Sequence, residues 1–345
     1  MNFASDNVTG IAPEILAAID AANRGAATPY GADEITRRLE QRFAALFERE
    51  VAVFPVATGT AANALALACV TPAWGAIYCH EEAHIATDEC GAPEFFTAGA
   101  KLVTCPGEHG KLTPGTLEGR IAGAGVVHQV QPAVLSITQE TEAGTVYRPD
   151  EIAALSGVAR QHGLALHMDG ARFANAVAGL NCSPAAVTWR AGVDVLSFGA
   201  TKNGALAAEA VVFFDPAKAA DFGFRRKRAG HLVSKQRFIA AQLEAYLADD
   251  LWLRNARHAN AMATRLGSGL ACLPGTRLLH PIDGNEIFIA LPEAAIDRLA
   301  AAGFGFYRWG AAPILRLVTA FDTELAAVEA FLQVAGVALS VPARP

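Results

Sequence analysis

The sequence of 345 residues predicts an α/β fold, with a large domain built on a mostly parallel sheet flanked by helices and a smaller C-terminal α+β domain. Short apolar runs alternate with alanine-rich helical stretches through the first two thirds of the chain, which is typical of a parallel sheet covered on both faces. One long helical pattern then covers about 237–266, without strand signals. We therefore expect a large domain over 1–240 and a small domain over 241–345.

The expected strands of the large domain are the apolar runs at 51–56, 76–79, 101–104, 133–137, 164–168, 193–198 and 210–214. A helix is expected from Pro149 to His162, because Pro149, Asp150 and Glu151 are typical of a helix start and Gly163 of a helix end. In the small domain we expect strands near 286–291 and 314–319 and helices near 292–302 and 323–333.

Residues 51–79 contain no Asp, Glu, Lys or Arg, a length that by itself would admit a membrane-spanning helix. Pro55, Gly59 and Pro72 interrupt this run. We therefore interpret it as a buried strand, a glycine turn and an Ala/Leu helix over 61–68, and expect no membrane partner.

Composition and charge exclude several classes of partner. The net charge of −6 gives no strong basic field and the dense basic cluster at 225–228 is short, so we expect no nucleic-acid partner. The six cysteines show no C-x-x-C pair and no metal-ligand spacing, which argues against a disulfide framework and a metal site. The N-terminus lacks a basic segment followed by an apolar core, so we expect no signal peptide and a cytoplasmic protein.

Ligands of α/β sheets bind where strands end, so the residues after each strand are the ones to inspect. Thr58, Gly59 and Thr60 join the first strand to a helix, where small residues let backbone N–H groups and hydroxyls approach a phosphate. The same turn would also serve as a simple helix cap, and this alternative stays open.

Two histidines are candidates for acid/base or stacking roles. His84 follows the strand that ends at Cys79 and is either a ring that stacks on a flat cofactor or a surface histidine at a helix start. His128 precedes the strand at 133–137 and is either an acid/base group or a loop histidine.

Asp169 and Lys202 end consecutive strands, separated by one helix. Lys202 stands out because it alone among six lysines follows an apolar strand, where desolvation would lower the pKa of its amine. A lysine that forms a Schiff base and a carboxylate that keeps a pyridinium nitrogen protonated suggest a pyridoxal 5′-phosphate site.

Basic residues suggest two further anion contacts. The stretch 225–237 is either a solvated helix face or a source of cations that neutralise a phosphate across a subunit interface. Arg316 lies inside an apolar strand and needs an anionic partner, for which a substrate carboxylate is a candidate; Arg308 is the competing choice.

With these residues in view, nearly the whole chain resembles the low-specificity L-threonine aldolases, pyridoxal phosphate enzymes of the aspartate aminotransferase fold type (fold type I). The segments that carry the resemblance are Ser5-Asp6-Asn7-Val8-Thr9, Pro29-Tyr30-Gly31-Ala32-Asp33, Ala57-Thr58-Gly59-Thr60-Ala61-Ala62-Asn63, Ala83-His84, His167-Met168-Asp169-Gly170-Ala171-Arg172, Thr201-Lys202-Asn203-Gly204 and Leu315-Arg316-Leu317-Val318-Thr319. These segments are specific for the family when they occur together and in this order, whereas each one alone is not.

The resemblance implies an enzyme that cleaves L-threonine, L-allo-threonine and related β-hydroxy amino acids to glycine and an aldehyde. It implies cofactor contacts from Lys202, Asp169, Arg172, Gly59, Thr60, His84, Arg228 and Lys235, and substrate contacts from Ser5, Tyr30, Arg172 and Arg316. Lys202, His84 and His128 are the expected catalytic residues, with the base that takes the β-hydroxyl proton open between the two histidines. Arg228 and Lys235 would reach a neighbouring subunit's phosphate in a homo-oligomer, a homotetramer built as a dimer of dimers.

Two departures from the family pattern concern substrate contacts. Asn7 replaces a usual threonine, and Gln139-Glu140-Thr141-Glu142 replaces a common Glu-Asn-Thr motif. Three alternatives remain: another enzyme of this fold, such as a β-eliminating lyase, aminotransferase or racemase; a non-catalytic pyridoxal phosphate protein; and a Rossmann dehydrogenase. The last would need a G-x-G-x-x-G motif after the first strand, and the sequence has none there.

Overall fold

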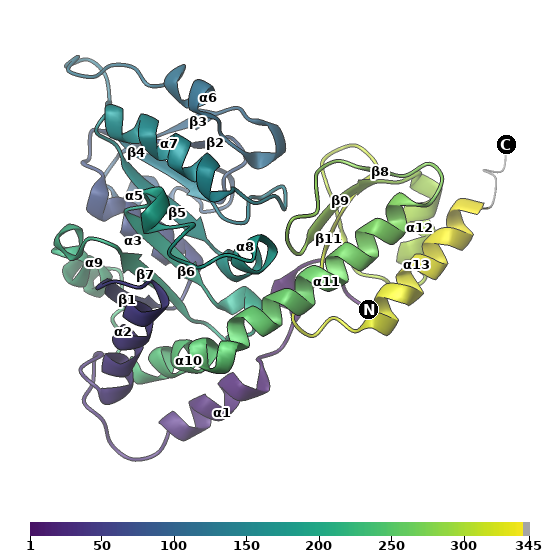
Figure 1. Cartoon of the computed structure of the whole chain (residues 1–345), viewed down its shortest axis with the longest axis horizontal. Helices are drawn as coiled ribbons and strands as arrows, with labels where there is room; N and C mark the ends of the chain where they lie inside the picture. Colours follow the sequence, from purple (N-terminus) through teal and green to yellow (C-terminus); the bar gives the residue numbers. More distant parts are fainter. Residues whose placement is uncertain (341–345) are drawn as a thin grey trace.

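The computed structural model describes residues 1–340 and divides them between a large sheet and a small sheet joined by long helices (Figure 1). The large sheet has seven strands in the order β1-β7-β6-β5-β4-β2-β3. Its strands are β1 (Ala52–Val56), β2 (Gly75–His80), β3 (Lys101–Cys105), β4 (Gln131–Thr138), β5 (Ala165–Gly170), β6 (Val195–Gly199) and β7 (Glu209–Phe213). All seven expected strands are therefore confirmed.

The middle of this sheet is parallel, because β2 pairs in parallel with β3 and β4, and β5 with β4 and β6. Strand β7 runs antiparallel to both β6 and β1. The carboxyl ends of β2, β4, β5 and β6 therefore meet at one edge, the place where α/β sheets bind ligands.

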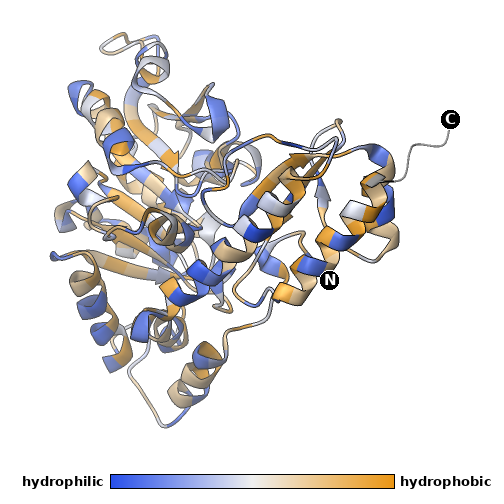
Figure 2. Ribbon diagram, turned by 45° about the vertical axis from the view of Figure 1, so that its right-hand side comes forward, coloured by the Kyte–Doolittle hydropathy of each residue, from blue (hydrophilic) through white to orange (hydrophobic). Residues whose placement is uncertain are grey.

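Helices cover both faces of the large sheet, whose hydrophobic strands run through the middle of the domain (Figure 2). The helices of this part are α1 (Pro13–Ala22), α2 (Glu34–Leu46), α3 (Gly59–Val70), α4 (His84–Thr87), α5 (Ala92–Phe96), α6 (Pro114–Glu118), α7 (Pro149–Gln161), α8 (Phe173–Leu180), α9 (Phe222–Arg228) and α10 (Arg237–Leu247). The core on one face is built with α3, α4 and α9, and the core on the other with α2, α7, α8 and α10.

The uncharged run at 51–79 is a buried strand, helix and strand, as expected, and α3 within it is buried over most of its length. Among residues 1–340, no helix is both long enough and apolar enough to cross a membrane.

The small sheet is antiparallel, in the order β10-β11-β9-β8. Its elements are α11 (Leu251–Ala271), β8 (Arg277–Leu278), β9 (Glu286–Ala290), α12 (Glu293–Ala301), β10 (Tyr307–Arg308), β11 (Ile314–Val318) and α13 (Leu325–Ser340). The first residues of the chain join this unit, since Phe3 is buried in its core and accepts a hydrogen bond from the Val318 N–H at 2.8 Å.

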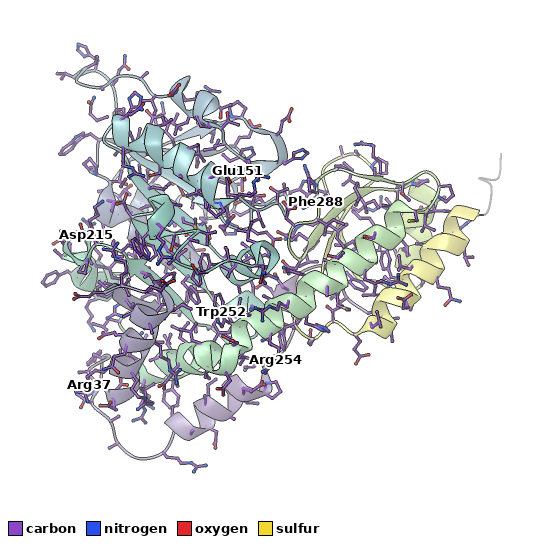
Figure 3. The ribbon with its side chains drawn as sticks, in the orientation of Figure 1. Arg37, Glu151, Asp215, Trp252, Arg254 and Phe288 are labelled. Atoms are coloured by element: carbon purple, nitrogen blue, oxygen red, sulfur yellow. The ribbon has the colours of Figure 1, made fainter. Side chains whose placement is uncertain are left out.

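The expectation of one long helix over 237–266 was wrong, because α10 and α11 are separate. Asp249 and Asp250 both have positive φ, at 50° and 54°, a conformation that ends one helix and that aspartate tolerates better than most residues. Beyond this break, Trp252 is buried against the large domain, and the more exposed Arg254 forms an ion pair with Glu14 of α1 (Figure 3).

Candidate active site

A cavity of about 400 Å³ opens at the carboxyl edge of the large sheet, a size suited to a cofactor and a small substrate. It brings together six of the residues singled out in the sequence, which are Gly59, Thr60, His84, Asp169, Arg172 and Lys202. These residues come from four separate segments of the chain, each of which lies at the end of a strand or at the start of a helix. The fold therefore assembles a site that no single motif defines.

Lys202 lies half-buried in a single 3₁₀ turn, Thr201–Asn203, directly after β6. The next residue anchors this turn, because the Asn203 amide donates to the Tyr246 hydroxyl at 2.7 Å and to the Trp252 carbonyl at 2.8 Å. Gly204 then adopts a φ of +114°, which L side chains rarely accept. The lysine is thus carried by a rigid segment that points it into the cavity.

The Asp169 carboxylate is held in place through both of its oxygens. The Asn63 side-chain amide donates to Oδ2 at 2.7 Å, and the Ala171 backbone N–H donates to Oδ1 at 3.0 Å. Asn63 also donates to Glu89 Oε1 at 2.8 Å, so helix α3 links two carboxyls of the cavity. Such fixed orientation suits a carboxylate that must meet one ring nitrogen.

The N-terminus of α3 forms the other end of the cavity. Thr58 caps this helix, since its hydroxyl accepts from the Ala61 N–H at 3.2 Å. The first N–H groups of a helix have no intrahelical acceptor, so Gly59 and Thr60 present donors and a positive helix end to the cavity. A Cβ built on Gly59 would meet no atom within 4 Å, which leaves free space for a phosphate group in front of the helix.

His84 begins α4 and borders the cavity with its ring half-buried. Its Nδ1 lies 2.9 Å from Glu89 Oε1, and this hydrogen bond raises the pKa of the imidazole despite the opposing effect of burial. Burial raises the pKa of Glu89 in turn. Sequence reasoning found His84 but missed Glu89, which lies on the loop after α4.

Three further acidic residues line the cavity. Sequence reasoning connected Glu140 and Glu142 with substrate contacts only as departures from the family pattern, and it missed Glu209. Burial raises the pKa of Glu142 and of Glu209 to about 7. Burial and the nearby Glu286 raise the pKa of Glu140 well above its usual range. Their positions in the sequence were a signal for a role in the site. Glu140 and Glu142 follow the expected strand at 133–137, and Glu209 precedes the expected strand at 210–214.

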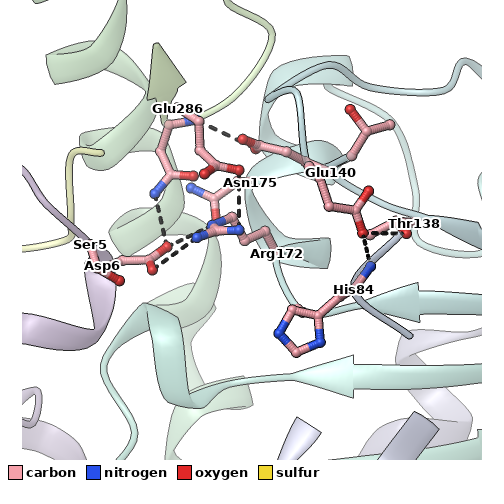
Figure 4. A network of polar contacts seen from close by, with 12 residues as sticks. Ser5, Asp6, His84, Thr138, Glu140, Arg172, Asn175 and Glu286 are labelled. Carbon is pink, nitrogen blue, oxygen red and sulfur yellow. Dashed lines mark hydrogen bonds and ion pairs between the residues drawn. The ribbon is translucent and has the colours of Figure 1, made fainter. Parts of the chain in front are cut away.

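Arg172 is the centre of a buried ionic network beside the cavity (Figure 4). Its Nε donates to Asp6 Oδ2 at 2.7 Å, and its Nη1 lies 3.1 Å from Glu286 Oε2. Burial alone would lower the pKa of the guanidinium, but Asp6 and Glu286 outweigh it and raise that pKa. Arg172 and Lys202 likewise outweigh burial and lower the pKa of Asp6.

Arg316 joins the same network from β11. Its Nε donates to Glu286 Oε1 at 2.9 Å, so one carboxylate contacts both Arg172 and Arg316. The anionic partner that an arginine inside an apolar strand requires is therefore present within the chain. The competing Arg308 is exposed and pairs with Glu293 and Asp297 on α12, away from the cavity.

Ser5 and Tyr30 lie outside the lining of the cavity. The Ser5 hydroxyl caps the turn at Asp6–Val8 by accepting from the Asn7 N–H at 3.1 Å, which places it next to Asp6 of the ionic network (Figure 4). Tyr30 is about half exposed, and the Lys227 ammonium lies 4.6 Å from the centre of its ring.

The structure does not bring His128, Arg228 or Lys235 to the cavity within one chain. His128 is exposed on the turn before β4, at the end of that strand opposite the cavity. Arg228 ends α9 and Lys235 precedes α10, and both are exposed. Any contact of the two cations with a cofactor would therefore come from another subunit.

The cavity has the donor set and the unsatisfied groups that a bound cofactor and substrate require. Within residues 1–340, four of its buried side-chain oxygens have no hydrogen-bond partner: Asn63 Oδ1, Glu89 Oε2, Glu140 Oε1 and Glu142 Oε2. Buried polar atoms are nearly always paired in native proteins, so such a cluster is typical of a ligand site or of protonated carboxyls. Lysine, fixed carboxylate and open helix N-terminus together fit pyridoxal 5′-phosphate.

Comparisons with known proteins agree with this geometry. The family model for beta-eliminating lyases matches residues 2–293. A low specificity L-threonine aldolase of Pseudomonas aeruginosa is 48% identical over 94% of this chain and 93% of that protein, and one of a Pseudomonas species is 47% identical over 94% of each. The solved structure of a Leishmania major threonine aldolase superposes with a TM-score of 0.92 at 30% identity, over 98% of this chain and 99% of that one.

Proposed function

Because the chain belongs to the beta-eliminating lyase family and, within it, to the low-specificity L-threonine aldolases, we propose that it cleaves L-threonine and L-allo-threonine reversibly to glycine and acetaldehyde. Related L-β-hydroxy-α-amino acids such as phenylserine would yield glycine and the corresponding aldehyde. The protein is a carbon–carbon lyase. The observation that carries the proposal is the meeting of Lys202, Asp169 and Arg172 in one cavity.

Pyridoxal 5′-phosphate is the cofactor in this proposal. When bound, it supplies a protonated ring that accepts the electron pair of a bond broken at the amino acid Cα. Lys202 would hold its aldehyde carbon and Asp169 its ring nitrogen, while Gly59 and Thr60 would donate to its phosphate. The half-buried ring of His84 would stack on it.

Arg172, Arg316 and Ser5 would hold the substrate carboxylate, with Tyr30 as a further substrate contact. Both arginines already contact Glu286. The substrate carboxylate would therefore share the N–H donors of Arg172 and Arg316 with the Glu286 carboxylate. Two guanidinium groups with planar donor pairs orient a carboxylate well, and a fixed carboxylate orients the bond that breaks.

A base must take the β-hydroxyl proton of the substrate, and His84 and His128 are the histidines proposed for this role. His84 lines the cavity, whereas His128 would act only from another subunit. His84→Asn and His128→Asn should be compared for cleavage rate at saturating cofactor. Two rates equal to that of the wild type would exclude both histidines.

The proposed assembly is a homotetramer in which Arg228 and Lys235 reach the phosphate of an adjacent subunit. Both residues are exposed and neither lines the cavity of its own chain, which supports this arrangement. Lys202→Ala and a double variant that replaces both Arg228 and Lys235 should each be inactive alone. Mixing the two proteins should restore part of the activity, because some of the shared sites then receive every group they need. No restoration would reject a shared site.

A cytoplasmic location is part of the proposal, because a reducing compartment suits the six unpaired cysteines.

Product analysis tests the proposed function. Purified protein with cofactor is mixed with L-threonine, L-allo-threonine and L-phenylserine, and the products are identified. We expect glycine and an aldehyde. Ammonia with a keto acid would indicate β-elimination, a D-amino acid would indicate a racemase, and no turnover would indicate a binding protein; each of these results would reject the proposal.

A further inference from the structure

A group other than histidine can serve as the base that takes the β-hydroxyl proton in this cavity. The hydrogen bond to Glu89 raises the pKa of His84, so this ring carries a proton over a wider pH range and is a poorer proton acceptor near neutral pH. His128 lies at the opposite end of β4. The remaining acidic groups of the cavity are therefore candidates to accept a proton.

Glu142 is held through one oxygen of its carboxyl, by a backbone N–H and a hydroxyl and not by the His84 ring. Its Oε1 accepts two hydrogen bonds, from the His84 backbone N–H at 2.8 Å and from the Thr138 hydroxyl at 2.9 Å (Figure 4). Its Oε2 has no partner among residues 1–340. The carboxyl group is thus fixed beside the backbone of the stacking histidine and keeps one oxygen free to carry a proton.

The other cavity acids are less suited to this task. Glu89 is hydrogen-bonded to His84 and Asn63, and Glu140 faces Glu286 and the ionic network. Glu209 accepts from the Ala200 N–H at the Lys202 turn. Glu142 therefore stands apart from the groups that position the lysine and from those that bind the arginines.

The Glu142 carboxyl titrates near neutral pH, and three of the titratable groups around it have raised pKa values of their own. The pKa of its carboxyl is about 7, because burial raises it and Asp169 adds to the rise. Cys79 on β2 and Tyr147 face it, but burial raises the pKa of Cys79 to about 12 and that of Tyr147 above its usual value. His84, with a raised pKa, contacts it through backbone only.

The geometry points to Glu142 as the catalytic residue that accepts the β-hydroxyl proton during cleavage and returns it during synthesis, an inference that rests on the proposed function. The O–H bond of the substrate breaks and its proton passes to the Glu142 carboxylate. The O–H electron pair forms the C=O bond of the aldehyde as the Cα–Cβ bond breaks. The Cα–Cβ pair remains with the glycine fragment, whose Cα then takes up one proton.

The variant Glu142→Gln tests this role in the cofactor-loaded enzyme, because glutamine keeps the acceptor for Thr138 and His84 but cannot accept the proton. We expect cleavage of L-phenylserine to slow by about a hundredfold or more. Exchange of the glycine α-proton with D₂O, followed by NMR, should stay within about threefold of the wild type, since glycine has no β-hydroxyl. We expect kcat/KM of the wild type to rise with pH through about 7 and this rise to be absent from the variant.

Glu94→Gln is the matched control, because Glu94 on α5 also has a buried, unpartnered Oε2 but lies outside the cavity. It should leave both rates unchanged. Equal loss of cleavage and of α-proton exchange in Glu142→Gln would show a structural role, and unchanged cleavage would exclude a proton transfer; either result overturns the inference. A wild type that releases no glycine and aldehyde would instead reject the proposed function.

Discussion

Replacement of Glu209 by glutamine should remove a pH dependence from the stability of the cofactor-free protein. Glu209 begins β7, is 6% exposed, and accepts from the Ala200 N–H at 3.1 Å. Burial raises the pKa of its carboxyl from 4.5 to about 7. Glutamine keeps the size and the acceptor but does not titrate, so the two proteins differ in this one ionisation.

The sign follows from the raised pKa of the folded state. Below pH 4.5 the carboxyl is protonated in both states; as the pH rises, the unfolded chain releases the proton first, and the folded state loses stability until the pH exceeds about 7. The shift corresponds to about 3 kcal/mol, most of which falls between pH 5 and pH 8. Relative to the wild type, Glu209→Gln should gain that amount of unfolding free energy over this range.

Urea unfolding measures the effect, with both proteins at one concentration and at pH 5 and pH 8. Other ionisable groups contribute equally to the two proteins and cancel in the difference. A difference in unfolding free energy that is the same at both pH values, or that changes in favour of the wild type at pH 8, would refute a buried carboxyl with a raised pKa beside Lys202.

Two further substitutions test how the site is held. Asn63→Ala removes the hydrogen bond to Asp169 Oδ2 and should weaken cofactor affinity by about tenfold, the equivalent of one lost bond of about 1.5 kcal/mol; an unchanged Kd in a titration of the cofactor-free protein would contradict this. Gly204→Ala places a Cβ at a φ of +114° and 3.0 Å from the Ala12 Cβ. It should cost at least about 1 kcal/mol of stability and lower the Tm, and an equal Tm would contradict the strain.

The parts of the fold that the sequence predicted are those with a local physical cause. Each strand of the large sheet is a short apolar run, and burial on both faces makes such runs continuous. Lys202 and Asp169 were identifiable because they interrupt the apolar pattern at strand ends, where parallel sheets collect ligand contacts. Arg316 was recognisable for a different reason, because it is a charged residue in the middle of an apolar strand.

Features with a weak local signal, or features that depend on long-range contacts, were not predicted. The break between α10 and α11 is encoded by two aspartates within an otherwise continuous helical pattern. The pairing of Arg316 with Glu286 requires the register of β11 against β9, and the contact of Asp6 with Arg172 joins residues 166 positions apart. Glu142 and Glu209 gained significance through burial, which periodicity does not reveal for single acidic residues beside a strand.

Borohydride trapping tests the central claim, that Lys202 carries the cofactor, most directly. The protein is loaded with pyridoxal 5′-phosphate, reduced with borohydride and digested, and the peptides are analysed by mass spectrometry. The account predicts a stable cofactor adduct on the peptide that contains Lys202 and its absence from Lys202→Ala. An adduct on any of the other five lysines, or no adduct at all, would contradict it.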